Sequence, residues 1–275
     1  MGILMAGLAP HPPVIIPEIG GERRLAATRT IKALAELAGE VKEQQPDLLI
    51  TISPHGPVFT DAISILEQEV LQGDFADFGY PAVSLAAATN SGFIESIRNN
   101  SAAAGIEVIS LATADLATYN YPNRLDHGVL VPLYFIRQAG LASPIVPITM
   151  GLLAYQRLYD FGLLIQQTLA EMKIKAVVIA SGDLSHRLKP GAPAGFNPRG
   201  KEFDQRVLSH LEKGQYGELL KIESQLVEKA GECGLRPLII MLGSLQGLSF
   251  RAEIKSYQGP FGVGYAVVGF YPPLN

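Results

Sequence analysis

Four of the five histidines in this 275-residue chain lie in short segments beside proline, glycine or aspartate. His11 stands in APHPP, His55 in SPHGP, His127 in LDHG and His186 in SGDLSH. Imidazole acts as a metal ligand and as a proton donor or acceptor near neutral pH, so these side chains are the leading candidates for chemistry. The fifth, His210, lies among charged residues of an expected helix, where we expect a surface side chain.

Three of these histidines follow apolar segments that are typical of buried strands. ILMAGLA precedes His11, DLLITIS precedes His55 and KAVVIAS precedes His186. In open α/β sheets the carboxyl ends of parallel strands form the edge at which ligands bind. We therefore expect these three imidazoles to meet there, in loops that neighbouring prolines stiffen enough for metal binding.

Carboxylates are the second requirement of such a centre. A divalent metal held by two histidines commonly takes one carboxylate, which leaves positions open for a substrate and O2. The candidates are Asp61, Asp126, Asp183 and Glu232. We expect Asp183 either to join the catalytic set by orienting His186 or to cap a turn. For Asp126 the structural alternative is a helix N-cap, and for Glu232 it is an interaction with a helix dipole.

The elements that must position these residues alternate along the chain. Expected strands lie at 3–9, 47–53, 61–67, 106–111, 145–150, 175–181, 249–257 and 262–271. Expected helices lie at 22–44, 91–104, 128–139, 155–172, 199–213, 215–230 and 235–246. This alternation predicts a single α/β domain over 1–275, with a mixed, mostly parallel sheet flanked by helices. The last two strands are expected to be antiparallel.

Composition excludes several classes of protein. Hydrophobic residues make up 48% and charged residues 17% of the chain, which favours a well-buried sheet and a homo-oligomer. A net charge of −4 without a basic cluster argues against a nucleic-acid partner. Cys233 is the only cysteine, so no intramolecular disulfide forms. No signal-peptide pattern or bilayer-length apolar stretch is present, so we expect a cytoplasmic protein without a membrane partner.

Five ordered motifs resemble those of one enzyme superfamily. APHPP, SPHGP, LDHGVLVPLYF, SGDLSH and AGECGLRP are similar to segments of the class III extradiol ring-cleavage dioxygenases and of the related Memo family. The dioxygenases in question are the protocatechuate-type catalytic beta subunits, and the resemblance extends from residue 8 to about 240. The resemblance implies a non-haem Fe(II) enzyme that opens a catecholic or aminophenolic ring with O2.

The resemblance also implies a role for each motif. His11, His55 and Glu232 correspond to the Fe(II) ligands. His186 corresponds to the catalytic acid–base, since a histidine near neutrality both accepts and returns a proton. His127 corresponds to a second active-site histidine that stabilises the bound oxygen or the substrate through a hydrogen bond.

Glu232 and Cys233 compete for the position of the third ligand, because the Memo family has a cysteine where the dioxygenases have a carboxylate. Adjacent residues at a helix entrance point about 100° apart, so both cannot ligate one metal. We expect Glu232 to bind, since a carboxylate suits Fe(II) with open positions and a thiolate favours Zn²⁺ or Cu(I). Cys233 is then expected to be a buried packing residue.

Three functions are consistent with these residues. The first is an Fe(II)-dependent extradiol dioxygenase with a small aromatic substrate, O2 and, as in some relatives, a small accessory subunit. The second is a Memo-like metal-binding protein without ring-cleaving activity. The third is a zinc hydrolase that uses the same histidines with Zn²⁺ and an activated water. Arg124, Arg187 and Arg236 are candidates for binding an acidic substrate, and residues 119–121 for lining its pocket.

Overall fold

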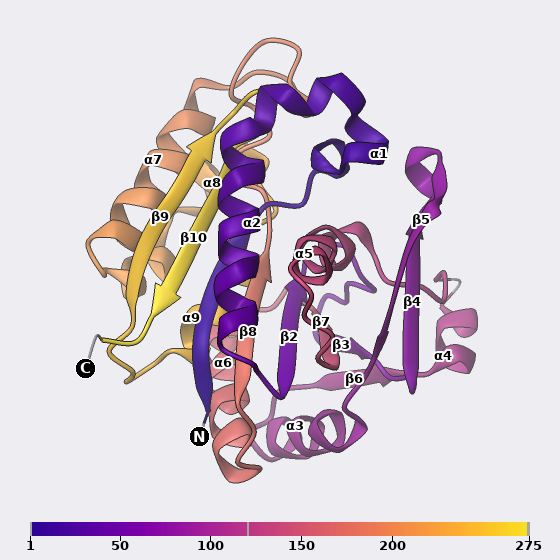
Figure 1. Ribbon diagram of the computed structural model, residues 1–275. Coiled ribbons are helices and arrows are strands. Elements are labelled where there is room, and N and C mark those ends of the chain that lie inside the picture. Colours follow the sequence, from indigo (N-terminus) through magenta and orange to yellow (C-terminus); the bar gives the residue numbers. More distant parts are fainter. Residues whose placement is uncertain (1, 120, 274–275) are drawn as a thin grey trace.

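A central sheet of eight strands carries helices on both faces (Figure 1). The computed structural model describes residues 2–119 and 121–273. The strand order in the sheet is β6-β3-β7-β2-β8-β1-β10-β9. These strands are β1 (Ile3–Ala9), β2 (Leu48–Ser53), β3 (Ile63–Leu66), β6 (Val108–Leu111), β7 (Ile145–Thr149), β8 (Ala176–Ser181), β9 (Arg251–Gln258) and β10 (Tyr265–Tyr271). The predicted α/β fold is confirmed.

The middle of the sheet is parallel and buried. β1 and β2 both run parallel to β8, with Gly7 beside Ile179 and Ile50 beside Val178. Every residue of β2 and β8 is buried, as expected of parallel strands that helices cover on both faces. The antiparallel pairs are β3 with β7, β10 with β1, and β10 with β9. The sheet is therefore mixed and mostly parallel, as the sequence predicts.

The helices form two layers, and each layer shares a separate apolar core with the sheet. The longer helices are α2 (Thr28–Glu43), α3 (Ser91–Ala103), α5 (His127–Gln138), α6 (Tyr155–Glu171), α7 (Pro198–Glu212), α8 (Ser224–Ala230) and α9 (Leu235–Ser244). The short ones are η1 (Pro13–Ile15), α1 (Pro17–Gly20), η3 (Ala76–Phe78) and α4 (Thr113–Thr118). Phe93, Phe161 and Leu238 of α3, α6 and α9 belong to one core, and Leu37 and Leu133 of α2 and α5 to the other. α2 lies in front of the sheet in Figure 1.

A two-stranded hairpin was not predicted. β4 (Val70–Phe75) and β5 (Tyr80–Ala88) pair antiparallel and stand apart from the main sheet at the right of Figure 1. β5 is mostly exposed, so the hairpin lacks the continuous apolar run that marks the buried strands. A Cβ on Gly73 would lie 2.8 Å from Leu125, whose N–H donates to the Gln72 carbonyl oxygen at 2.7 Å. The hairpin is thereby held against the segment that leads into α5.

Helix boundaries differ from the predicted ones in two places. The expected helix at 22–44 begins with a 3-10 helix, η2 (Gly21–Ala27), before α2. The expected helix at 215–230 is divided into η4 (Tyr216–Lys221) and α8. Pro132 lies inside α5, where packing on all sides offsets the missing hydrogen bond. Within residues 2–119 and 121–273, no helix has the length and apolar character needed to cross a membrane.

Candidate metal centre

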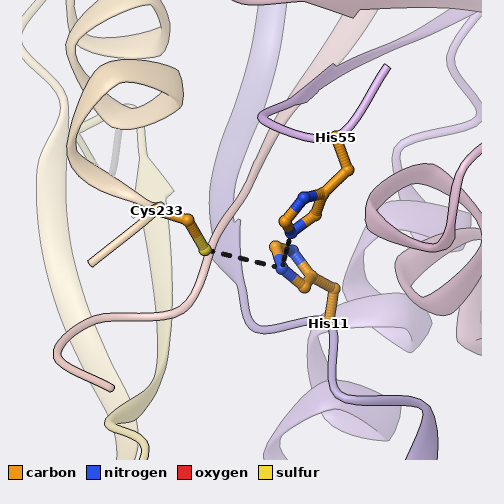
Figure 2. Close-up of side chains that lie close together, drawn as sticks. All are labelled: His11, His55 and Cys233. Atoms are coloured by element: carbon orange, nitrogen blue, oxygen red, sulfur yellow. Dashed lines mark hydrogen bonds between the residues drawn. The ribbon is translucent and has the colours of Figure 1, made fainter. Parts of the chain in front are cut away.

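His11, His55 and Cys233 form a compact group at the carboxyl edge of the central strands (Figure 2). One ligand atom of each lies within 4.8 Å of the other two. The Nε2 atoms of His11 and His55 are 3.0 Å apart, and Cys233 Sγ is 3.6 Å from His11 Nε2. The three residues follow β1, β2 and α8, so only the fold brings them together.

Hydrogen bonds from the backbone hold both histidine loops. The His11 N–H donates to Asp183 Oδ1 at 3.0 Å, which ties the loop after β1 to the loop after β8. The His55 N–H donates to Ser53 Oγ at 3.2 Å, at the end of β2. The His11 side chain is buried and that of His55 is half-buried. Rigid loops of this kind suit metal ligation.

Close backbone packing brings Cys233 to the histidines. α8 ends at Gly231 with a positive φ of 60°, and the chain then turns toward β8. A Cβ on Gly182 would clash with the Cα of Gly234, so a glycine at 182 permits this approach. The Cys233 N–H donates to the Asp183 carbonyl oxygen at 3.2 Å, and the Asp183 N–H donates to Cys233 Sγ at 3.3 Å. The latter contact favours the thiolate form.

Glu232 does not join this group, contrary to our expectation. Its carboxylate accepts a hydrogen bond from the Leu235 N–H at 2.6 Å, in the first turn of α9. The structure therefore shows the helix-terminus role for Glu232 and places the half-buried Cys233 beside the histidines. The physical reason is directional: the backbone bonds with Asp183 turn Cys233 inward, which leaves its neighbour facing α9. The third member of the group is thus Cys233 and not Glu232, and which of the two binds a metal stays a prediction.

Ser181 determines which nitrogen of His11 faces the group. Its hydroxyl donates to the carbonyl oxygen of Gly128, and its Oγ lies 2.9 Å from His11 Nδ1. Because the hydroxyl has one proton and the carbonyl only accepts, His11 Nδ1 must carry the proton that it donates to Ser181. His11 Nε2 then presents a lone pair to His55 and Cys233. This is the tautomer that a metal ligand requires.

His127 stacks on the group from the start of α5. Its ring centroid lies 4.3 Å from that of His55 at 25° and 5.2 Å from that of His11. Asp126 caps α5, because its carboxylate accepts from the backbone N–H groups of Gly128 and Val129. The N-cap alternative is therefore the one that the structure shows for Asp126.

His186 contacts the thiol end of the group. The His186 Nε2 atom lies 3.7 Å from Cys233 Sγ. The backbone N–H of His186 donates to the Ala230 carbonyl oxygen at 3.2 Å. Among the described residues, Asp183 makes no hydrogen bond with the His186 ring. It connects the loops of His11 and Cys233 instead, so Asp183 is a positioning residue here and does not orient His186.

A cavity of about 180 Å³ opens beside His55 and His127. Its other walls come from the hairpin and from the segment before α5: Asp74, Asp77, Phe78, Tyr121, Pro122, Arg124, Leu125 and Asp126. Three hairpin residues of this lining, Asp74, Asp77 and Phe78, were not predicted from the sequence. The two acids and the aromatic residue in DFADF were the only local signal for them.

The expected pocket segment at 119–121 is only partly involved. The Tyr121 hydroxyl donates to the His55 carbonyl oxygen at 2.7 Å and lines the cavity. Tyr119 is exposed and packs against Phe59, at a centroid distance of 5.2 Å. Asn120 lies outside the described residues.

Burial keeps the imidazoles neutral. It lowers the pKa of His11 well below 6.5, and the neighbouring histidines lower it further. It also lowers the pKa values of His55 and His186. Burial and the nearby His55 lower the pKa of His127 to about 4, with Asp77 opposing them. Neutral imidazole is the form that binds metals and accepts protons.

The thiol at the centre needs a cation if it is to ionise. Burial raises the pKa of Cys233 well above 9.0, and the charges of Asp183 and Glu232 raise it further. A metal ion would supply the missing positive charge and displace the thiol proton. Two imidazole nitrogens and one thiolate suit Zn²⁺, iron or copper, and not Mg²⁺ or Ca²⁺, which prefer oxygen ligands.

A family model and a curated relative both match most of this chain. The family described as "Catalytic LigB subunit of aromatic ring-opening dioxygenase" matches residues 5–268. Protein CA_C1420 from Clostridium acetobutylicum is 38% identical over 261 residues, which cover 95% of this chain and 56% of that protein. A MEMO1 family protein from Thermococcus onnurineus is 30% identical over 169 residues, covering 54% of this chain and 55% of that protein. The chain thus spans about half the length of these curated relatives.

One solved structure shares the fold over nearly the whole chain. The crystal structure of the uncharacterized protein JW3007 from Escherichia coli K12 covers 97% of this chain and 99% of that chain. The TM-score is 0.62 and the sequence identity is 16%, so this likeness concerns the fold alone.

Proposed function

This chain belongs to the family of catalytic LigB subunits of aromatic ring-opening dioxygenases, and on that premise we propose a metal-dependent enzyme that acts on a small aromatic diol. The observation that carries the proposal is the group of His11, His55 and Cys233 next to a cavity of about 180 Å³. A cavity below the usual 300–1,000 Å³ of ligand pockets suits a single ring with short substituents.

The metal ligands proposed are His11 Nε2, His55 Nε2 and Cys233 Sγ. Fe(II) is the ion that ring opening with O2 requires, and Zn²⁺ is the alternative that the thiolate favours. When bound, such an ion would polarise the ring oxygens, and iron would also mediate electron transfer from the ring to O2.

The neighbouring histidines supply proton transfer. His186 is neutral near pH 7 because burial lowers its pKa, so its ring can accept the proton of a ring hydroxyl and later return it. His127 is neutral as well and can form a hydrogen bond with a ring oxygen. The Phe78 ring lies edge-on to His127, with 5.3 Å between the ring centroids, and would exclude water from one side of a bound substrate ring.

A Memo-like metal protein without ring-opening activity is the second candidate. The observation in its favour is Cys233, which stands where the dioxygenases have a carboxylate. A thiolate binds Zn²⁺ or Cu(I) more readily than a carboxylate does, and neither ion activates O2 for ring opening in the way that Fe(II) does. A zinc hydrolase on the same residues is the third candidate.

Anaerobic metal loading distinguishes these candidates. The metal-free protein is loaded with Fe(II) or Zn²⁺, mixed with catechols and 2-aminophenol, and exposed to O2. Ring opening predicts a yellow product with Fe(II) alone, and a loss of about 10²–10⁴-fold in turnover for His186→Ala with the metal retained. Tight metal binding without product favours the Memo-like candidate. Ester or amide hydrolysis with Zn²⁺ favours the third.

A further inference from the structure

The cavity beside the histidines has an aromatic wall. Phe78 is 41% exposed, and its ring lies edge-on to His127 with 5.3 Å between the centroids. The His127 ring in turn stacks on His55, which belongs to the metal-binding group. An aromatic molecule in this cavity would therefore pack against two ring edges and reach the metal ligands with one end.

The charged side chains in the cavity lining beside Phe78 carry more negative than positive charge. Arg124 pairs with Asp77 and lies 3.6 Å from Asp74, so one guanidinium faces two carboxylates. The Arg124 side chain is 29% exposed, that of Asp74 33% and that of Asp77 71%. These three side chains together leave one negative charge in excess at the mouth of the cavity.

Among the described residues that line the cavity, no second basic side chain offsets that charge. Arg124 is the one arginine or lysine among the described residues that line the cavity. Arg236 donates to the Leu153 carbonyl oxygen and lies over the Tyr155 ring, 5.1 Å from its centroid. An aromatic carboxylate, the substrate class for which we expected an arginine partner, would meet a guanidinium already paired with two acids.

We propose that this cavity selects small aromatic molecules that carry a protonated amine and disfavours aromatic carboxylates. The ring packs against Phe78 and His127, and the ammonium group donates to Asp77, the more exposed carboxylate. This inference names the substrate class of the site proposed above and rests on that function. It assigns substrate selection to the hairpin β4–β5, which lies outside the main sheet.

Three matched probes test the charge preference without any activity assay. Phenethylamine, 2-phenylethanol and phenylacetate share one ring and differ in charge, and each is titrated into the full chain by ligand-observed NMR. We expect the amine to bind about two- to five-fold more tightly than the alcohol, and the acid to bind most weakly, the range for a partly exposed ion pair. Added salt should reduce the preference.

Two variants locate the effect. Asp77→Asn should abolish the advantage of the amine over the alcohol, because it removes the negative charge and keeps the side-chain shape. Asp160→Asn, a change of the same kind on α6 and outside the cavity, should leave the order unchanged. Equal binding of the three probes, or no binding of the amine, overturns the proposal. Tighter binding of the acid that is lost in Arg124→Gln would make Arg124 a carboxylate-binding residue and also overturn it.

A second series separates this inference from the proposed function. The Fe(II)-loaded protein is titrated anaerobically with 4-methylcatechol, 4-(2-aminoethyl)catechol and 3,4-dihydroxyphenylacetate. Tightest binding of the amine supports both proposals. Binding of all three without the amine preference overturns the inference and leaves the function standing. If no catechol perturbs the metal spectrum, the proposed function fails and the substrate assignment fails with it, whatever the NMR series shows about the charge preference of the cavity.

Discussion

At the scale of single residues, Glu232 and Cys233 show how two neighbours take unrelated roles. Glu232 bonds to the first turn of α9, while Cys233 Sγ lies 3.6 Å from His11 Nε2. Both arrangements follow from the backbone contact between Asp183 and the Cys233 loop. Substitution can therefore separate the proposed metal ligands from the residues that only lie next to them.

Cys233→Ala should lower metal affinity at least about 100-fold, more than changes outside the ligand shell usually do. Glu232→Ala should keep the metal and instead cost about 0.5–1.5 kcal/mol of unfolding free energy through the lost hydrogen bond with the Leu235 N–H. Chelator competition measures the first quantity and urea unfolding the second. If Glu232→Ala lost the metal and Cys233→Ala retained it, Glu232 would be the ligand instead.

Ser181→Ala should weaken metal binding about 10–100-fold, because His11 loses the partner that holds its proton on Nδ1. Ser181→Thr keeps a hydroxyl and should retain most of the affinity. Ser185→Ala is the matched control: this buried hydroxyl donates to the Ala230 carbonyl oxygen, accepts from the Arg187 N–H and makes no hydrogen bond with a described histidine ring. The direct readout is the ¹⁵N spectrum of the metal-free protein, in which His11 should change tautomer only in Ser181→Ala.

At the scale of elements, the loop after β8 organises the site, since it touches both the His11 loop and the Cys233 loop. Gly182→Ala would place a Cβ against Gly234 and push these loops apart. We expect metal affinity to fall more than tenfold and the unfolding free energy to fall by about 1–3 kcal/mol, as overpacking does. Gly39→Ala, in α2 with open space around it, should keep the metal and stabilise the protein slightly.

Asp204 joins α7 to the same loop and to β9. Its Oδ1 accepts from the Ser185 N–H at 2.8 Å and its Oδ2 from the Tyr257 hydroxyl at 2.7 Å. Burial raises the pKa of Asp204 from 3.8 to about 6, so the folded protein holds this proton more tightly than the unfolded chain does.

The sign of the resulting pH dependence follows from linkage. The charged carboxylate penalises the folded state above pH 6, and this penalty disappears as the pH falls toward 4. Relative to Asp204→Asn, the wild-type protein should gain up to about 3 kcal/mol between pH 7 and pH 4. Urea unfolding of both proteins across this range measures the difference. Parallel pH profiles for the two proteins would contradict the raised pKa.

At the scale of the whole molecule, a metal ion would connect the ends of β1 and β2 with the loop between α8 and α9. Binding to the folded state alone stabilises it by about 4 kcal/mol at a thousandfold excess over the dissociation constant. Saturating metal should therefore raise the melting temperature by several degrees, and a chelator should reverse the shift. Cys233→Ala should show little response. A melting temperature that does not change with metal would argue against the metal centre. The homo-oligomer expected from composition stays a prediction.

Local sequence patterns were enough to predict the alternation of strands and helices and the placement of His11, His55 and His186 after buried strands. Those features depend on local periodicity and on short apolar runs, which neighbouring residues encode. The family resemblance narrowed the candidates for a third ligand from Asp61, Asp126, Asp183 and Glu232 to the neighbouring pair of Glu232 and Cys233.

Contacts between distant segments place Cys233, and not Glu232, beside the histidines, and they form the hairpin wall of the cavity. The direction of Cys233 depends on bonds to Asp183, 50 positions away, and the proton on His11 depends on Ser181, 170 positions away. β4 and β5 are exposed and pair mainly with each other, so no buried apolar run marks them in the sequence. Side-chain direction and tautomer are set by contacts between distant segments, and local sequence patterns contain no information about such contacts.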